Sequence, residues 1–257
     1  MAGFDADVTA CAQLVERGDP DRFLAVMAAP VAARLVLFPI YAMNVEVSRA
    51  PWVTAEPMIA EMRLQWWRDA LAEIAGGGTV RRHEVVTPLA GVLSADLAGE
   101  LDAAVAMRRW DIYRDAFEDA QDFQRYIDAT SGSLLWAAVR SLGDADETVV
   151  RDAGYAQGLA NFLCAVPELE AQGRVPLVDG RVEAVRELAE DGLQRLSRAR
   201  KSRGSVSQQA APAMLAVWQA GAMLRHAARD PASVGEGRLA RGPRRLALMA
   251  RAATGLW

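Results

Sequence analysis

Alanine is the residue that most constrains the fold of this chain. The sequence of 257 residues contains 50 alanines but only five isoleucines. Alanine is the strongest helix former, whereas isoleucine favours strands. No segment alternates apolar and polar residues over the length of a strand. With 52% hydrophobic and 24% charged residues, the chain is typical of a folded protein with a sizeable core, and we predict an all-α fold.

The net charge and the rare residue types exclude several classes of protein. A formal charge of −4 at pH 7 argues against nucleic-acid binding, because such domains need a basic surface. Cys11, Cys164, His83 and His226 are too far apart in sequence to suggest a zinc site or a disulfide framework. The N-terminus carries neither a basic nor an apolar signal region. We therefore expect a reducing, cytoplasmic setting.

Helix breakers interrupt the most apolar part of the chain, residues 25–43. Pro30, Arg34 and Pro39 fall within it, whereas a membrane-spanning helix needs about 20 nearly uninterrupted apolar residues. We expect a buried core helix in this segment.

Apolar residues at spacings of three and four predict a helix from Glu56 to Ile74, ended by the glycines at 76–78. Its expected apolar face consists of Ile59, Met62, Trp66 and Ala70. Further helices are expected over residues 97–142 (two or more), 144–165, 181–203 and 212–229, with Pro167 ending the second and Pro212 starting the last. No change in composition marks a boundary, so residues 1–257 are interpreted as one domain.

Four motifs in a fixed order resemble one known family. They are Asp21-Arg22-Phe23-Leu24-Ala25 with Tyr41-Ala42-Met43-Asn44, Arg63-Leu64-Gln65-Trp66-Trp67-Arg68, the segment 126–143 around Ser131-Gly132-Ser133-Leu134, and the segment 155–169 followed by Gly173-Arg174. Together they resemble the squalene/phytoene synthase family. The resemblance covers about residues 20–228 and leaves a helical tail at 229–257.

The resemblance implies an isoprenoid (terpenoid) synthase-like helical bundle around a central cavity. In that family two aspartate-rich helices face each other, and their carboxylates hold Mg²⁺ that neutralises a leaving diphosphate. This chain departs from the pattern in both signatures. The expected aspartates of the first signature fall on Ser48, Arg49 and Trp52, and those of the second fall on Ala165 and Leu169.

Few acids remain near these degenerate positions. The first signature also contains Asn44 and Glu46, and Glu168 is the one acid kept in the second. Glu46 and Glu168 could form a weak residual metal pair, or they could serve as capping or surface residues. Because paired carboxylates are missing, ionisation of a diphosphate should be slowed by many orders of magnitude. We therefore predict no catalytic residue, no metal and no cofactor.

By analogy with the family, several further side chains could contact a ligand or line the cavity. They are Arg34, Tyr41, Arg63, Trp66, Trp67, Gln157, Asn161 and Arg174. The alternatives are salt bridges for Arg34, Arg63 and the neighbouring Arg68, plain packing for the two tryptophans, and hydrogen bonds between helices for the two amides.

Two charged clusters also have alternative interpretations. The spacing of Asp111, Asp115, Asp119 and Asp122 could place them on one helix face, as a cation site or as a solvated face paired with nearby arginines. The basic residues Arg195, Arg198, Arg200, Lys201 and Arg203 could contact anionic lipid headgroups. They could equally be a solvated helix end favoured by the helix dipole.

The form of the degeneration resembles the branch of the family that contains the mitochondrial complex I assembly factor with a phytoene synthase-like domain. That resemblance implies a non-catalytic role in building NADH dehydrogenase, with complex I subunits or assembly intermediates as partners and a peripheral contact at the inner face of the cytoplasmic membrane. An active head-to-head prenyl diphosphate transferase, which would need Mg²⁺, is one alternative. A prenyl- or lipid-binding module is another.

Overall fold

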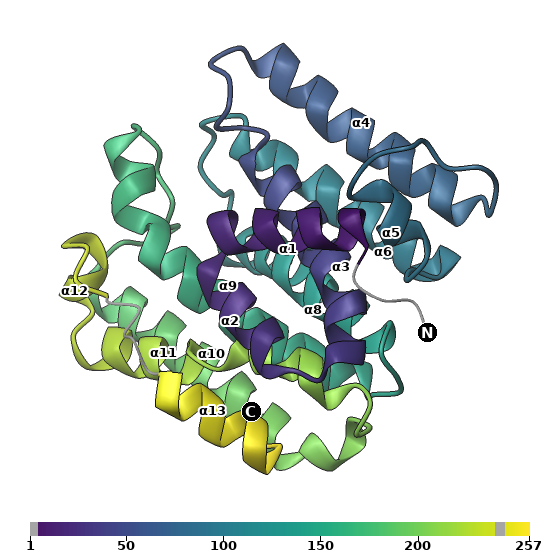
Figure 1. Ribbon diagram of the computed structural model, residues 1–257. Helices are drawn as coiled ribbons and strands as arrows, with labels where there is room; N and C mark the ends of the chain where they lie inside the picture. The colour runs from purple at the N-terminus through teal and green to yellow at the C-terminus, as the bar shows by residue number, and fades with distance from the viewer. Residues whose placement is uncertain (1–4, 240–244) are drawn as a thin grey trace.

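The computed structural model describes residues 5–239 and 245–257, and Figure 1 shows an assembly of helices throughout these residues. The α-helices are α1 (Ala6–Gly18), α2 (Pro20–Ala28), α3 (Val31–Arg49), α4 (Pro57–Ala75), α5 (Val86–Ala90), α6 (Ala95–Met107), α7 (Ala120–Ile127), α8 (Ser133–Arg140), α9 (Glu147–Ala171), α10 (Val182–Lys201), α11 (Ala220–Arg229), α12 (Ala232–Gly235) and α13 (Arg245–Thr254). Three short 3₁₀ segments are η1 (Arg108–Asp111), η3 (Arg203–Ser205) and η4 (Ala211–Val217), and η2 (Asp128–Gly132) is a π-helical turn.

The all-α prediction is confirmed for the described residues. The β-type pairing recorded among them is one isolated bridge between Ala145 and Val206. The first four residues, which belong to the N-terminus expected to lack a secretion signal, lie outside the described residues, as do residues 240–244 of the expected helical tail.

Helix α9 occupies the middle of the bundle. It packs against α8, α10 and α11 and against the turns η2 and η4. Ala153, Ala156 and Ala160 are fully buried in it. Side chains this small let neighbouring helices approach closely, so the alanine content serves packing as well as helix propensity. The buried side chains form one cluster that extends from Cys11 to Trp257.

Two glycines allow η2 to lie directly against α9. A Cβ on Gly154 would stand 2.9 Å from the Cα of Gly132, and a Cβ on Gly158 would stand 2.5 Å from the Cβ of Ser131. Real Cβ atoms do not make contacts this short, so only glycine fits at these positions without a shift in the backbone. The π-helical turn is therefore held at a fixed depth against the central helix, and it positions Thr130 and Ser131.

Helix α3 is long and apolar enough to span a membrane by length and composition, with a mean hydropathy of 1.3 over its 18-residue window. However, 56% of that window is buried inside the protein, including Leu37, Phe38 and Ile40. The expectation of a buried core helix is confirmed. Pro30 separates α2 from α3, whereas Pro39 lies inside α3 without ending it.

The predicted face of α4 is correct at Ala70, which is buried, and in part at Trp66, which is half-buried, but it is wrong at its other two residues. The helix buries Ala60, Leu64, Trp67, Leu71 and Ile74, which recur at spacings of three and four against α6. Ile59 and Met62, which the sequence analysis assigned to the apolar face, are exposed. Both patterns have helical period, and the sequence alone did not show which of them faces α6. The helix ends at Gly76, as predicted, and Gly77 adopts a φ of +66°.

Three other expectations also fail in detail. Helix α9 passes through Pro167 and continues to Ala171, because Val166 and Leu169 on this last turn are buried in the core. The helix expected over 212–229 is divided into η4 and α11. Asp111, in η1, and Asp119, which caps α7, belong to different elements, so the four aspartates do not share one helix face.

Replacing Gly158 by alanine should reveal the close packing of η2 on α9. We expect Gly158→Ala to lower the free energy of unfolding by about 1–3 kcal/mol, because the new methyl group overpacks the contact with Ser131 and Ile127. The matched control is Gly99→Ala in α6, where a Cβ meets nothing within 4 Å. This control should gain roughly 0.5–1 kcal/mol from lower unfolded-state entropy. Urea unfolding measures both, and equal effects would contradict the packing argument.

Candidate functional site: a cavity between α3 and α9

A cavity of about 310 Å³ lies between α3 and α9. Its remaining walls come from the ends of α1 and α2, from η1, and from α7 with η2. The lining residues are Gly18, Asp19, Arg22, Asn44, Ser48, Trp52, Arg108, Asp111, Tyr126, Ile127, Thr130, Ser131, Gly158, Asn161, Phe162, Ala165 and Leu169. The volume is at the lower end of the range of small-molecule sites.

Two rows of residues spaced four apart face this cavity. Asn44 and Ser48 of α3, with Trp52 just beyond the helix, form the first row, and Asn161, Ala165 and Leu169 of α9 form the second. Residues four apart lie on one face of a helix, which explains why each whole row points inward. The degenerate signature positions Ser48, Trp52, Ala165 and Leu169 thus line the cavity, and none of them carries a carboxylate.

The first acid of the cavity, Asp19, is held by α2. Its Oδ1 accepts a hydrogen bond from the backbone N–H of Arg22 at 3.1 Å and caps the helix. Its Oδ2 pairs with Nη1 of Arg22 at 2.6 Å. The guanidinium of Arg22 also lies 5.4 Å from the centre of the Tyr41 ring. The charges of Asp19 and Arg22 therefore neutralise each other within this short segment.

The second acid, Asp111, belongs to a buried triad. It is 5% exposed, and the hydroxyl of Tyr126 donates a hydrogen bond to its Oδ1 at 2.6 Å. Arg108 donates to its Oδ2 and to the Tyr126 oxygen, both at 3.1 Å. Burial and the charge of Asp111 raise the pKa of Tyr126. Burial alone would lower the pKa of Arg108, but Tyr126 and Asp111 outweigh it and raise that pKa.

These residues do not fit the Mg²⁺ ions that the fold implies. Mg²⁺ in such a site needs carboxylates that are free to bind the ion and its diphosphate. The two carboxylates of the cavity are each paired with an arginine of the same segment. Across residues 5–239 and 245–257, no group of three or more His, Cys, Asp or Glu side chains could hold a metal. The cavity therefore lacks the donor set of a diphosphate-ionising site.

The acids that could have replaced the lost aspartates lie elsewhere. Glu168 is exposed, does not line the cavity and accepts a hydrogen bond from Nε2 of Gln172 at 2.8 Å. Glu46 is half-buried and Arg49 is exposed, and neither belongs to the cavity lining.

Tyr41 and Gln157 line a second, much smaller hollow of about 10 Å³, which shares Arg22 and Ser131 with the cavity. The Tyr41 hydroxyl and Oε1 of Gln157 are buried and have no hydrogen-bond partner among the described residues. Nε2 of Gln157 donates to Oδ1 of Asn161 at 3.0 Å. Burial raises the pKa of Tyr41 to about 12, although Arg22 opposes the shift.

The remaining predicted contacts lie outside the cavity. Arg34 donates to the carbonyls of Met27 and Ala29 and thereby caps α2. Arg63 is exposed on α4. Trp67 is buried, and its ring meets that of Trp66 at 5.1 Å in an edge arrangement.

Arg174 does not line the cavity itself but contacts Asp111 and Trp52, which do. It is almost fully buried, and its guanidinium donates to the backbone carbonyls of Trp110, Asp111 and Tyr113. It also lies over the Trp52 ring, 5.0 Å from its centre. Arg174 therefore ties the segment after α9 to η1 and so positions Asp111.

The sequence analysis did not identify the charged lining of the cavity. Asp111 was interpreted as part of a cation site or of a solvated face, whereas the structure buries it and pairs it with Arg108. Asp122 and Arg125 of the same cluster do form a partly exposed ion pair. The apolar neighbours Trp110 and Ile112, on either side of Asp111, are the sequence signal that could have indicated that Asp111 is buried.

With this geometry described, the chain can be compared with known proteins. Residues 15–179 match the profile of the family described as squalene/phytoene synthase. This match covers more than half of the chain, and the protein belongs to that family.

The curated relatives carry another name. A protein of Drosophila melanogaster named "NADH dehydrogenase (ubiquinone) complex I, assembly factor 6 homolog" is 30% identical over 166 residues, which are 61% of this chain and 50% of that protein. The assembly factor 6 protein of Bos taurus is 24% identical over 64% of this chain and 51% of its own length. The Homo sapiens protein is also 24% identical, over 61% of this chain and 48% of its own length. The chain thus spans about half the length of these relatives.

Solved structures of similar fold are synthases. A dehydrosqualene synthase in complex with a ligand superposes with a TM-score of 0.79 at 14% identity, covering 96% of this chain and 95% of that one. A squalene synthase, HpnC from Alicyclobacillus acidocaldarius, gives 0.69 at 15% identity, covering 87% and 94%. At this identity the similarity establishes the fold, and it confirms the isoprenoid synthase-like architecture.

Neutralising Asp111 should destabilise the protein strongly. In Asp111→Asn the Arg108 charge loses its buried anionic partner, and we expect a loss of about 3 kcal/mol in the free energy of unfolding. Asp122→Asn breaks the more exposed pair with Arg125 and should cost less than about 1 kcal/mol. Guanidinium chloride unfolding of both variants provides the measurement, and similar losses would argue against a buried triad.

Buried tyrosines should make the protein sensitive to alkali. An unfolded tyrosine ionises near pH 10, whereas the pKa of folded Tyr41 is about 12. The folded state therefore keeps its proton when the unfolded state has lost it. This contribution to stability is complete below about pH 10 and is lost as the pH rises to about 12. Absorbance of tyrosinate measured against pH should show Tyr41 ionising only late or with unfolding, and Tyr41→Phe should remove that step.

Proposed function

We propose that this protein is a catalytically inactive member of the squalene/phytoene synthase family that acts as an assembly factor for respiratory complex I (NADH dehydrogenase). The observation that carries the proposal is the cavity itself. Its two facing rows of residues keep the positions of the family's signatures but offer no free carboxylate. The similarity to proteins named complex I assembly factor 6 supports the same conclusion.

The alternative of an active prenyl transferase has less support. Such an enzyme has to stabilise the negative charge of a leaving diphosphate, and an uncompensated charge in a buried site costs several kcal/mol. Glu46 and Glu168, the acids that could have supplied displaced metal ligands, do not line the cavity. Arg22 and Arg108 could attract a diphosphate, but Asp19 and Asp111 already neutralise them. We therefore propose that the protein works without Mg²⁺ or another cofactor.

A prenyl- or lipid-binding role for the cavity is also less well supported. Two ion pairs line the cavity, together with the polar side chains of Asn44, Asn161 and Thr130. A prenyl chain would remove water from these groups without offering them hydrogen bonds, and each loss costs free energy.

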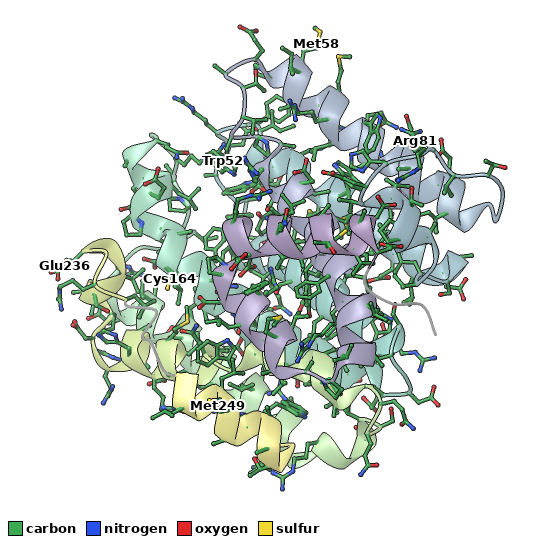
Figure 2. The ribbon with its side chains drawn as sticks, viewed as in Figure 1. Trp52, Met58, Arg81, Cys164, Glu236 and Met249 are labelled. Carbon is green, nitrogen blue, oxygen red and sulfur yellow. The ribbon has the colours of Figure 1, made fainter. Side chains whose placement is uncertain are left out.

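An assembly factor needs a surface for its partners, and the segment from Trp52 to Met62 offers one. Met58 and Met62 are 74% and 66% exposed, and Trp52, Val53 and Ile59 are also exposed. Figure 2 shows Met58 at the outer end of α4, away from the rest of the bundle. Exposed apolar clusters mark interaction sites, and methionine adapts to varied partners. We propose that complex I subunits or assembly intermediates contact this surface, in the cytoplasm and at the inner face of its membrane.

Deleting the gene should lower the NADH:quinone oxidoreductase activity of isolated membranes and remove the assembled complex from native gels. The wild-type gene should restore both. The double variant Met58→Ser/Met62→Ser should fold normally but restore them poorly, whereas Met249→Ser, an equally exposed methionine on α13, should restore them fully. Normal complex I in the deletion strain would exclude the assembly role.

Incubation of the purified protein with Mg²⁺ and farnesyl or geranylgeranyl diphosphate tests the absence of catalysis. No condensed hydrocarbon product is expected, while an authentic dehydrosqualene synthase under the same conditions supplies the positive control. A product above the level of heat-treated protein would restore the enzymatic alternative.

A further inference from the structure

We propose that the protein binds a phosphate group at a second site, in a hollow lined by α10, η3 and α11. The hollow has a volume of about 680 Å³ and shares no lining residue with the cavity between α3 and α9. Its lining residues are Leu193, Leu196, Ser197, Arg200, Lys201, Arg203, Gly204 and Arg225. Figure 1 shows α10, α11 and α13 gathered near the marked C-terminus.

Two guanidinium groups, one from α10 and one from α11, meet at this hollow, and a third on α13 lies near it. Nη1 of Arg200 and Nη1 of Arg225 lie 3.2 and 3.3 Å from the point that a Cβ on Gly221 would occupy. Those two nitrogens therefore share one small space, which the missing side chain of Gly221 leaves open. Arg251 of α13 is close enough for its charge to act on Arg200. Lys201 and Arg203 add two exposed positive charges at the rim.

The described residues balance these charges only in part. None of the ion pairs within residues 5–239 and 245–257 involves Arg200, Arg225 or Arg251. Nε of Arg200 donates to an oxygen of Trp257, the last residue of the sequence, at 2.8 Å. The single negative charge of a terminal carboxylate at this place does not offset the charges of Arg200, Arg225 and Arg251. Nη2 of Arg200 is buried and has no hydrogen-bond partner. Burial together with the charges of Arg251 and Arg225 lowers the pKa of Arg200 to about 10.

The helix dipole does not account for this arrangement. Basic residues at the end of α10 are favoured by its negative end, which explains Lys201 and Arg203. Arg225 and Arg251 come from other helices, and the first turn of α11, beside Gly221, contains no acid and contributes positive potential. A buried donor without a partner and like charges held together cost free energy unless an anion compensates them.

A phosphate group would supply the negative charge and the hydrogen-bond acceptors that the arginines of this hollow need. Its anionic oxygens accept several charge-assisted hydrogen bonds at once, and guanidinium groups bind such oxygens in a bidentate manner. The phosphate could belong to a soluble phosphate compound or to a phospholipid headgroup at a membrane surface. The hollow is open enough for either source, and the site does not depend on the proposed role in complex I assembly.

Binding of three phosphate probes to the full chain tests the site. Inorganic phosphate and pyrophosphate are titrated calorimetrically, and vesicles of phosphatidylcholine with phosphatidylglycerol are compared by co-sedimentation with vesicles of phosphatidylcholine alone. At least one probe should bind the wild-type protein. Arg200→Gln and Arg225→Gln should each weaken that binding by about tenfold, the loss expected for one charge-assisted hydrogen bond. Arg17→Gln, an equal charge change on exposed α1, should leave it unchanged.

Binding of free phosphate or pyrophosphate assigns the site to soluble phosphates, and binding to phosphatidylglycerol vesicles alone assigns it to a lipid headgroup. Failure of all three probes, or equal weakening by Arg17→Gln, overturns the proposal. Arg225 is exposed, so its variant should fold. Without anion, Arg225→Gln should raise the Tm because it removes repulsion. A lower Tm would show that Arg225 serves the fold, and this result would also overturn the proposal.

Discussion

The contact between η2 and α9 determines the shape of the site more than any other interaction in this protein. Gly154 and Gly158 remove two side chains from α9, and the π-helical turn fills the space they leave. This contact places Thr130 and Ser131 beside the row of Asn161 and Ala165, so the cavity receives its polar wall from the same packing that stabilises the bundle. Because core packing is dense, the cavity cannot change shape without disturbing the central helix.

Charged groups are arranged in opposite ways in the cavity and in the hollow beside α10 and α11. In the cavity, Asp19 and Asp111 are each paired with an arginine of the same short segment, so the pairs form as soon as the local backbone folds. Between α10 and α11, positive groups from distant parts of the sequence lie close together, and no acidic side chain of the described residues forms an ion pair with Arg200 or Arg225. The first arrangement leaves no free carboxylate in the cavity lining, whereas the second concentrates positive charge at the hollow.

The solved structures that share the fold of this chain and its curated relatives carry different names. The synthases that share its fold are 14% and 15% identical to it, whereas the relatives named as assembly factors are 24–30% identical over about half of their own length. A fold can host many functions, and the side chains of the site decide among them. In this chain Ser48, Arg49, Trp52, Ala165 and Leu169 stand where the family resemblance places aspartates, and the proposed function rests on this difference.

The sequence by itself determined the all-α fold, the family and the loss of the carboxylates, because helix propensity, breaker residues and ordered motifs are local properties of the chain. Half of the site could be predicted in this way, namely the two rows on α3 and α9, since residues four apart share a helix face. The other half could not, because Asp19, Arg108, Asp111 and Tyr126 reach the cavity only through packing between elements. The same reason explains why the buried face of α4 and the continuation of α9 through Pro167 were misjudged. Tertiary contacts alone decided which of several equally periodic faces is buried and where the arginines of α10, α11 and α13 meet.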